Sequence, residues 1–381
     1  MALTSEQIDN LEILTMQTVN RLTDWILSDI CRRIAEAGKF TSTAEYQTWR
    51  LKSLGMKEKE IKKEISKRLQ ITQGEIDELI EKAAKDSYEN DISKLNATEA
   101  LEFKDNKQLQ QILSAAKILA NSQFSNITQT MGFVAPNGKV SKLTQAYQRC
   151  CDFANLQVTT GATDYNTAVK NATRNLLHYG VRSIDYASGI NRSVEAAVRG
   201  AVFGGIGLMQ EQISQENHDT LGADGWEISA HRMSAPDHEP FQGRQYTDRQ
   251  YQTINNLLKR RIGTLNCKHI AFPIRYGVTQ RAYTDEQLQQ WKRENKKRIQ
   301  YNGKSYKLYE ATQKQRSIER AIRQQKRNIL VANAIFRATG NDEQLKIQKT
   351  KLTLLQQEYN NFSKVAGLQP QYNRTNIGVN V

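Results

Sequence analysis

The sequence contains no long apolar run. Its longest nearly apolar stretch covers residues 196–209 and is interrupted by Arg199, whereas a membrane-spanning helix needs about 20 apolar residues. The N-terminal segment carries Glu6, Asp9 and Glu12, which is not the pattern of a secretory signal. Since only 38% of the residues are hydrophobic, we expect a polar protein without a membrane span.

Cysteine and proline are scarce as well. The four cysteines are Cys31, Cys150, Cys151 and Cys267. Four are too few for a disulfide framework in a chain of 381 residues, which favours a reducing compartment. The five prolines leave residues 1–135 and 274–369 uninterrupted. Because proline ends or kinks a helix, nothing forces a break in either region.

Common catalytic motifs are missing too. There is no Gly-x-Ser-x-Gly, no His-Glu-x-x-His and no phosphate-binding loop. The segment Gly132–Lys139 includes Pro-Asn-Gly-Lys, but its spacing is wrong, and Val140 stands where a phosphate loop needs Ser or Thr. This segment predicts a hairpin or loop tip, and we expect no enzymatic activity.

Helical periodicity dominates the rest of the chain. Apolar residues in the first 135 positions recur at spacings of three and four. Residues 52–82 predict two short helices joined near Thr72, and residues 192–217 predict a long helix. Within that long helix, Gly200 and Gly204 predict a packing seam, because small residues let another backbone approach closely.

Only one stretch gives a convincing strand signal, the alternating segment 226–231. The following region, 232–276, is rich in loops. From Thr284 to about Val365 the pattern is helical, with a break at 339–342 that predicts an antiparallel helical hairpin. The segment after Pro370 shows no pattern and predicts an extended tail.

These patterns predict a mainly α fold with a small α+β module, in which extended helical arms surround a compact, loop-rich central domain. Four regions follow: helices at 1–135, the α+β module at 140–280, a basic helical hairpin at 281–369 and the tail at 370–381.

The net charge of +14 is concentrated in one place. Residues 281–330 hold 14 basic and 5 acidic side chains, whereas residues 201–280 are neutral overall. A basic band suits contact with DNA phosphates, although a solvated basic helix face would have the same composition. The candidate DNA-binding residues are Lys292, Arg293, Lys296, Lys297, Arg298, Lys304, Lys307, Arg316, Arg320, Arg323, Lys326 and Arg327.

Histidine is rare, yet three of the five histidines fall between positions 231 and 269. The candidate metal ligands in this segment are His231, Asp237, His238, Cys267 and His269. Imidazole, thiolate and carboxylate groups are the ligands that zinc prefers, so a structural zinc ion is the candidate cofactor. A metal-free cluster that ties the loops together by hydrogen bonds is the favoured interpretation, the structural zinc site is the alternative, and a metal-activated water is a third interpretation.

The same residues carry a family resemblance. The runs Gly189–Arg199, Leu221–His231, Pro236–Arg244 and Asn266–Pro273 resemble the minor capsid, or head morphogenesis, proteins of tailed bacteriophages. The similar group is phage minor capsid protein 2, within the Mu F-like minor head proteins. The matching signature residues are Arg192, His231, Pro236, Asp237, His238, Gln242, Gly243, Asn266, Cys267, His269 and Pro273.

The resemblance implies a virion component at the capsid interior or portal vertex, assembled in the host cytoplasm. It implies a portal protein as partner, with scaffold or major capsid protein and packaged double-stranded DNA as further partners, and a role in genome packaging, retention or ejection. It brings no catalytic residues. The alternative is a metal-dependent nuclease that uses His231, Asp237, His238 and His269.

Overall fold

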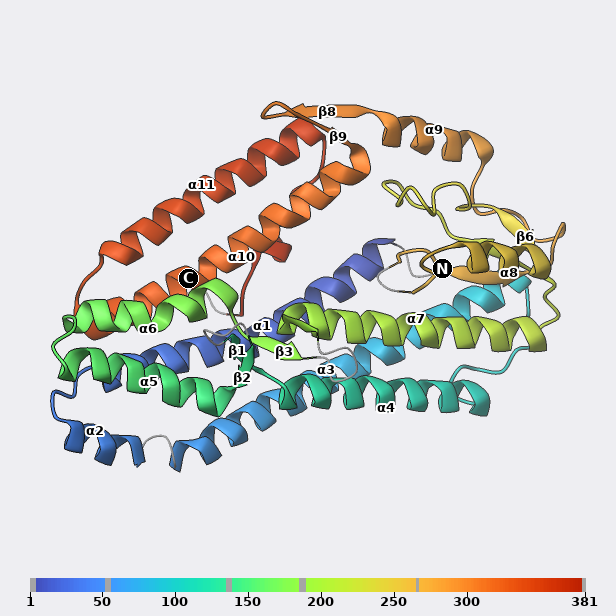
Figure 1. The fold of residues 1–381 in the computed structure, drawn as a ribbon. Helices are drawn as coiled ribbons and strands as arrows, with labels where there is room; N and C mark the ends of the chain where they lie inside the picture. Colours follow the sequence, from blue (N-terminus) through green and yellow to red (C-terminus); the bar gives the residue numbers. More distant parts are fainter. Residues whose placement is uncertain (1–4, 52–55, 135–138, 185–189, 265–266, 379–381) are drawn as a thin grey trace.

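The computed structural model describes residues 5–51, 56–134, 139–184, 190–264 and 267–378 (Figure 1). Its α-helices are α1 (Ser5–Ala37), α2 (Thr43–Arg50), α3 (Met56–Leu95), α4 (Lys107–Gln129), α5 (Leu143–Thr159), α6 (Tyr165–Tyr179), α7 (Val194–Thr220), α8 (Asp248–Leu257), α9 (Asp285–Lys296), α10 (Leu308–Thr339) and α11 (Glu343–Ala366). A short 3-10 helix, η2, covers Tyr372–Thr375.

Within the described ranges, three small antiparallel sheets accompany the helices. The strands are β1 (Gly132–Val134), β2 (Val140–Lys142), β3 (Arg182–Ile184), β4 (Asn191–Ser193), β5 (Gly225–Ile228), β6 (Gln245–Thr247), β7 (Ala271–Ile274), β8 (Arg298–Tyr301) and β9 (Lys304–Lys307). Their orders are β2-β1-β3-β4, β6-β5-β7 and β8-β9. The expected mainly α fold with a small α+β module is confirmed. None of the described helices combines the length and apolarity that a membrane crossing requires.

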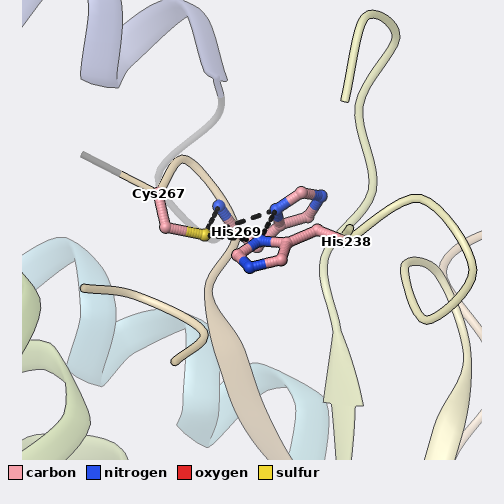
Figure 2. A group of neighbouring side chains, drawn as sticks. All are labelled: His238, Cys267 and His269. Atoms are coloured by element: carbon pink, nitrogen blue, oxygen red, sulfur yellow. Dashed lines mark hydrogen bonds between the residues drawn. The ribbon is translucent and has the colours of Figure 1, made fainter. Parts of the chain in front are cut away.

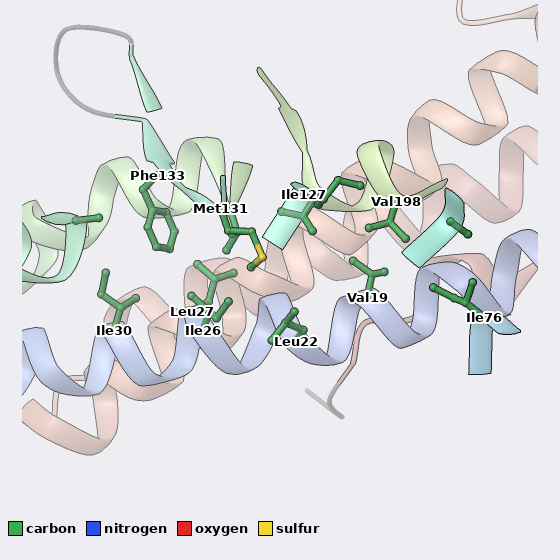
Figure 3. Packing of buried hydrophobic residues seen from close by; sticks show 14 of the residues in the cluster. Val19, Leu22, Ile26, Leu27, Ile30, Ile76, Ile127, Met131, Phe133 and Val198 are labelled. Carbon is green, nitrogen blue, oxygen red and sulfur yellow. The ribbon is translucent and has the colours of Figure 1, made fainter. Parts of the chain in front are cut away.

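Helix α1 lies at the centre of the largest core (Figure 3). Its residues Leu22, Ile26, Ile30 and Ile34 follow one another at intervals of four and are buried, so they form one continuous apolar stripe. Helices α5, α7 and α10 pack against α1. Burying each of these side chains contributes about 1.5–3 kcal/mol, which makes α1 the main structural support of the molecule.

Residues from three of the four expected regions contribute to this core. Phe133 of β1, Val198 of α7 and Val331 of α10 all belong to the same buried cluster as Ile26. Helices from the N-terminal, central and C-terminal parts therefore share one apolar interior, and the division of the chain into four regions stays a prediction.

Two local expectations are wrong. Helix α3 continues through Thr72 instead of breaking there, because Ile76 and Ile80 bury their side chains in the large core. The segment after Thr284 is not one long helix, since α9 is followed by the β8–β9 hairpin before α10 begins. Asn302 and Gly303 supply the two positive φ angles, 47° and 74°, that a tight two-residue hairpin turn needs.

Two predicted hairpins, one helical and one between strands, are confirmed. The helical hairpin is confirmed as α10 and α11, which pack together and are separated by Gly340 at φ 74°. The hairpin predicted near Gly132 is confirmed as β1–β2, while its tip, residues 135–138, lies outside the described residues. The packing seam predicted at Gly200 and Gly204 is wrong, because an added Cβ would meet no described atom within 4 Å at either position; the close backbone approach in α7 is at Gly207, where an added Cβ would lie 2.1 Å from the carbonyl oxygen of Gly263.

The tail also differs from the extended segment that was expected. The side chains of Arg374 and Ile377 are buried, and the N–H of Gly378 donates to Oδ2 of Asp24 in α1 at 2.6 Å. Helix η2 packs against α10, where Arg323 donates to the carbonyl oxygen of Arg374. The described part of the tail is therefore part of the packed body.

Candidate functional site

The histidine-rich loops are arranged by the three-stranded sheet β6-β5-β7. Central strand β5 pairs Trp226 with Tyr246 on one side and with Pro273 on the other. Strand β7 is an edge strand, which is where a sheet tolerates proline. His231 follows the end of β5, and Cys267 and His269 precede β7. Since β5 and β7 are antiparallel, these residues meet at one end of the sheet.

A buried carboxylate links the sheet to the chain that follows it. Glu227 of β5 is fully buried. Its Oε2 accepts a hydrogen bond from Nε2 of Gln245 at 2.9 Å, and its Oε1 accepts one from the N–H of Ala282 at 2.9 Å. A buried charge needs such partners. Glu227 was not among the candidate residues, and its position on an alternating strand gave no reason to expect it inside.

Three of the five predicted metal ligands converge (Figure 2). The Sγ of Cys267 lies 3.2 Å from Nδ1 of His238 and 3.4 Å from Nδ1 of His269. The two Nδ1 atoms are 3.4 Å apart. Both histidines are buried, at 1% and 2% exposure, and Cys267 is partly buried. Three donor atoms of the types that zinc prefers therefore face one another.

Neighbouring groups determine which ring nitrogen faces the cluster. Nε2 of His238 lies 2.9 Å from the carbonyl oxygen of Arg260, and Nε2 of His269 lies 3.0 Å from Oε1 of Gln242. Gln242 was predicted only as a signature residue, whereas Arg260 acts through its backbone, which no sequence signal reveals. Burial keeps the pKa of His269 well below its usual value and raises the pKa of the Cys267 thiol.

The other two predicted ligands lie beside this group. The ring of His231 stacks on that of His269 with centroids 4.4 Å apart, and its Nδ1 lies 2.8 Å from the carbonyl oxygen of Arg232. Asp237 forms an ion pair with Arg260 at 3.2 Å. Neither is among the three residues whose donor atoms converge in the described part of the chain.

Of the other signature residues, Gly243 has a clear structural explanation. Gly243 has φ 70°, and an added Cβ would meet Leu288 at 2.6 Å, so only glycine fits there. Pro236 is exposed in the turn that ends with His238 donating its backbone N–H to Ala235 at 3.0 Å. Arg192 is exposed on β4. Asn266 lies outside the described residues.

The basic band divides into an exposed and an internal part. The β8–β9 hairpin lies at one end of the α10–α11 pair, and helix α9 continues beyond it along the outer edge of the molecule (Figure 1). Their exposed basic residues, together called the basic edge below, are Lys292, Arg293, Lys296, Lys297, Arg298, Lys304 and Lys307. Arg320 of α10 is exposed as well.

The internal part is used in ion pairs and hydrogen bonds. Arg316 pairs with Glu319 at 3.1 Å, Arg323 with Glu195 at 2.6 Å and Arg327 with Asp24 at 2.8 Å. Lys326 is half-buried, and its Nζ donates to Oδ1 of Asn376 at 3.3 Å. These four members of the predicted DNA-binding set therefore hold the fold together, a role that charge composition does not distinguish from DNA contact.

Comparison with protein-family models matches residues 3–364 to phage minor capsid protein 2. The chain belongs to this family. The resemblance that rested on the histidine, cysteine and glycine positions is thereby confirmed across nearly the whole chain. Searches of curated proteins and of solved structures returned no match.

Membership of the phage minor capsid protein 2 family identifies the chain as a structural protein of the phage head, and so as a virion component that assembles with other head proteins. It favours a structural over an enzymatic role. The nuclease alternative gains no support from the site, because the carboxylate of Asp237 is paired with Arg260 outside the converging trio.

Proposed function

We propose that this minor capsid protein contacts packaged double-stranded DNA through the basic edge while it is bound at the portal vertex inside the capsid. The observation that carries the proposal is the exposure of seven basic side chains on two consecutive elements, α9 and the β8–β9 hairpin. Such a surface gains affinity for DNA by releasing counterions from the phosphates.

The hairpin holds this surface in a defined position. Its inner face carries Tyr301 and Tyr306, whose rings meet Phe362 of α11 edge-on at 5.0 and 5.8 Å. Arg298 and its cross-strand partner Lys307 lie on the opposite face and are exposed. Because the aromatic face is packed, the basic side chains project from a supported element, and fewer degrees of freedom are lost when DNA binds.

Helix α9 extends the same surface. Lys292 and Lys296 are separated by four positions and so lie on one helix face, and Lys297 follows directly at the helix end. All three side chains are exposed. Residues Lys292, Lys296 and Lys297 make no ion pair among the described residues, which leaves their charges available for phosphates.

Two triple variants of the full-length protein test the DNA contact. One carries Lys292→Gln, Lys296→Gln and Lys297→Gln. The matched control carries Lys349→Gln, Lys351→Gln and Lys364→Gln, three exposed lysines of α11, so both variants lose the same charge. Affinity for duplex DNA is measured over a series of salt concentrations. Each lost phosphate contact flattens the slope of log K against log salt by about 0.9.

We expect the α9 variant to lose up to about 2.7 in slope and the α11 variant to keep the slope of the unaltered protein. Equal effects of the two variants, or binding of the unaltered protein that does not depend on salt, would contradict the DNA contact.

Portal binding is the second part of the proposal, and family membership supports it. Co-purification of the full-length protein with the portal protein of the same phage tests it separately. We expect a complex that both triple variants still form, because we propose that the helical body contacts the portal and that the basic edge contacts DNA. Scaffold protein and major capsid protein serve as comparison baits, and equal recovery on all three would argue against a specific portal contact. At the portal vertex and in contact with DNA, the protein would contribute to genome packaging, retention or ejection.

A further inference from the structure

We propose that His238, Cys267 and His269 bind a zinc ion. Zinc holds nitrogen ligands at about 2.0–2.1 Å and sulfur at about 2.3 Å in a tetrahedron. Two nitrogens in such a site are about 3.4 Å apart, and nitrogen and sulfur about 3.6 Å apart. The distances of 3.4 Å between the two Nδ1 atoms, and of 3.2 and 3.4 Å from Sγ to each of them, lie close to these values.

The hydrogen bonds of the two rings favour a cation over a metal-free cluster. A backbone carbonyl can only accept, so Nε2 of His238 must donate its proton to Arg260. Oε1 of Gln242 can only accept, and it already accepts from the backbone N–H of His231 at 3.1 Å, so Nε2 of His269 is the donor toward this amide oxygen. The hydroxyl of Ser234, 3.3 Å from the same nitrogen, donates to the carbonyl oxygen of Ala235 and can accept from Nε2 as well. In the neutral rings, both Nδ1 atoms then present lone pairs to each other.

One thiol proton cannot satisfy this arrangement. The S–H of Cys267 can be donated to Nδ1 of His238 or of His269, which leaves the other buried lone pair without a donor. A cation bound by both nitrogens and by the thiolate satisfies all three atoms at once. The backbone N–H of His269, 3.4 Å from Sγ, adds a donor that stabilises a thiolate.

The donor set also selects the metal. Two imidazoles and one thiolate suit zinc, whereas magnesium and calcium prefer oxygen ligands. The hydrogen bonds from Nε2 of His238 and His269 to Arg260 and Gln242 provide the outer contacts that orient histidine ligands in metal sites. Three protein ligands leave one tetrahedral position, which water fills in zinc sites of this type.

Such an ion would join two loops that the sheet alone does not connect. His238 lies in the loop between β5 and β6, while Cys267 and His269 lie on the approach to β7. Because ligands on separate loops must come together to bind the metal, binding free energy stabilises the folded loops. The zinc site is distinct from the basic edge and does not depend on the proposed DNA contact.

Metal analysis and cobalt substitution of the full-length protein test the site. We expect about one zinc ion per chain after purification without chelator. We also expect that the cobalt-substituted protein shows a thiolate-to-cobalt charge-transfer band and the strong visible bands of tetrahedral cobalt. The variants Cys267→Ser and His269→Gln should lose the charge-transfer and tetrahedral bands respectively, with circular dichroism as the check on folding.

His231→Gln is the matched control, because His231 stacks on His269 but is outside the converging trio. It should keep both the zinc and the charge-transfer band. The proposal is overturned if the unaltered protein binds less than about 0.2 zinc per chain and its cobalt complex lacks the charge-transfer band, a result that does not depend on whether any variant folds. Loss of the band in folded His231→Gln would overturn the assignment of the ligands.

Discussion

Arg327 of α10 donates its Nε–H to Oδ1 of Asp24 in α1 over 2.8 Å, and the carboxylate of Asp24 is fully buried. The other carboxylate oxygen accepts the backbone N–H of Gly378. Three parts of the chain, from its beginning and its end, therefore meet at one charged group. Breaking a buried pair on one side leaves an uncompensated charge, which costs about 3–5 kcal/mol.

Asp24→Ala should accordingly lower the free energy of unfolding by about 3–5 kcal/mol, because Arg327 and the N–H of Gly378 lose their acceptor. Denaturant unfolding followed by circular dichroism measures the change. The control is Glu89→Gln, which removes the exposed ion pair with Lys85 and should cost less than about 1 kcal/mol. Equal stability of the two variants would show that the buried pair does not support the junction.

The glycines of α7 allow a matched comparison on one helix. An added Cβ at Gly207 would collide with the carbonyl oxygen of Gly263, whereas one at Gly204 meets no described atom within 4 Å. Gly204→Ala should stabilise the protein by roughly 1 kcal/mol, since alanine favours helix more than glycine does. Gly207→Ala should destabilise it by about 1–3 kcal/mol.

Thermal unfolding of both α7 variants gives the two signs directly. If the two variants were equally stable, the carbonyl oxygen of Gly263 would not lie against Gly207 of α7. That loop leads to Cys267, so the comparison also reports on how the histidine–cysteine loops are held against the helical body.

The isosteric change of glutamate to glutamine should lower the free energy of unfolding more at buried Glu227 than at an exposed position. Both of its oxygens accept hydrogen bonds, from Gln245 and from Ala282. In Glu227→Gln, one oxygen becomes an NH₂ group that faces a donor, which should cost about 1–3 kcal/mol. Glu99→Gln, at an exposed loop position, should change the free energy of unfolding by less than about 0.5 kcal/mol. If urea unfolding showed a small effect at both sites, the hydrogen bonds of Glu227 with Gln245 and Ala282 would not stabilise the fold.

Much of the helical architecture was predictable because it follows from local spacing. Ile318 and Ile322 mark the apolar face of α10, and the break at Gly340 separates two helices that pack together. The break expected near Thr72 was wrong because local propensity is weak and tertiary burial of Ile76 and Ile80 overrides it.

Other features needed the three-dimensional structure. Asn302 and Gly303 carry a hairpin signal, but the helical spacing around them predicts a continuous helix, and only the structure shows their positive φ angles. The pairing of Arg327 with Asp24 spans 303 positions, so no local pattern reveals it. For this reason the basic band was identified correctly as a concentration of charge, yet its division into exposed and internal residues was not predictable.

The candidate metal site was predictable as a set of residue types, but not as a geometry. His238, Cys267 and His269 converge, whereas His231 and Asp237 lie beside them. All five occur in loops, where side-chain direction depends on turns and on backbone partners that have no periodic signal. Sequence spacing alone could not separate ligands from neighbours.

Asp91 of α3 is a buried carboxyl whose Oδ2 accepts hydrogen bonds from Ser214 and Asn217 of α7, both at 2.9 Å. Burial raises its pKa to about 7, although these hydrogen bonds act in the opposite direction. The unfolded carboxyl has a pKa of about 3.9. Between these two values the folded state holds more protons than the unfolded state, so the contribution of Asp91 to stability is lost as the pH rises.

Asp91→Asn removes this titration and keeps the shape of the side chain. Relative to the variant, the unaltered protein should lose up to about 4 kcal/mol of unfolding free energy between pH 4 and pH 7, with no further change above that range. Ser214→Ala removes a donor that lowers the pKa, so it should move the upper end of the transition to higher pH. Urea unfolding at a series of pH values measures both effects. If the two curves were parallel, the pKa of Asp91 would be the same in the folded and the unfolded state. Burial between α3 and α7 would then not penalise the ionised carboxylate.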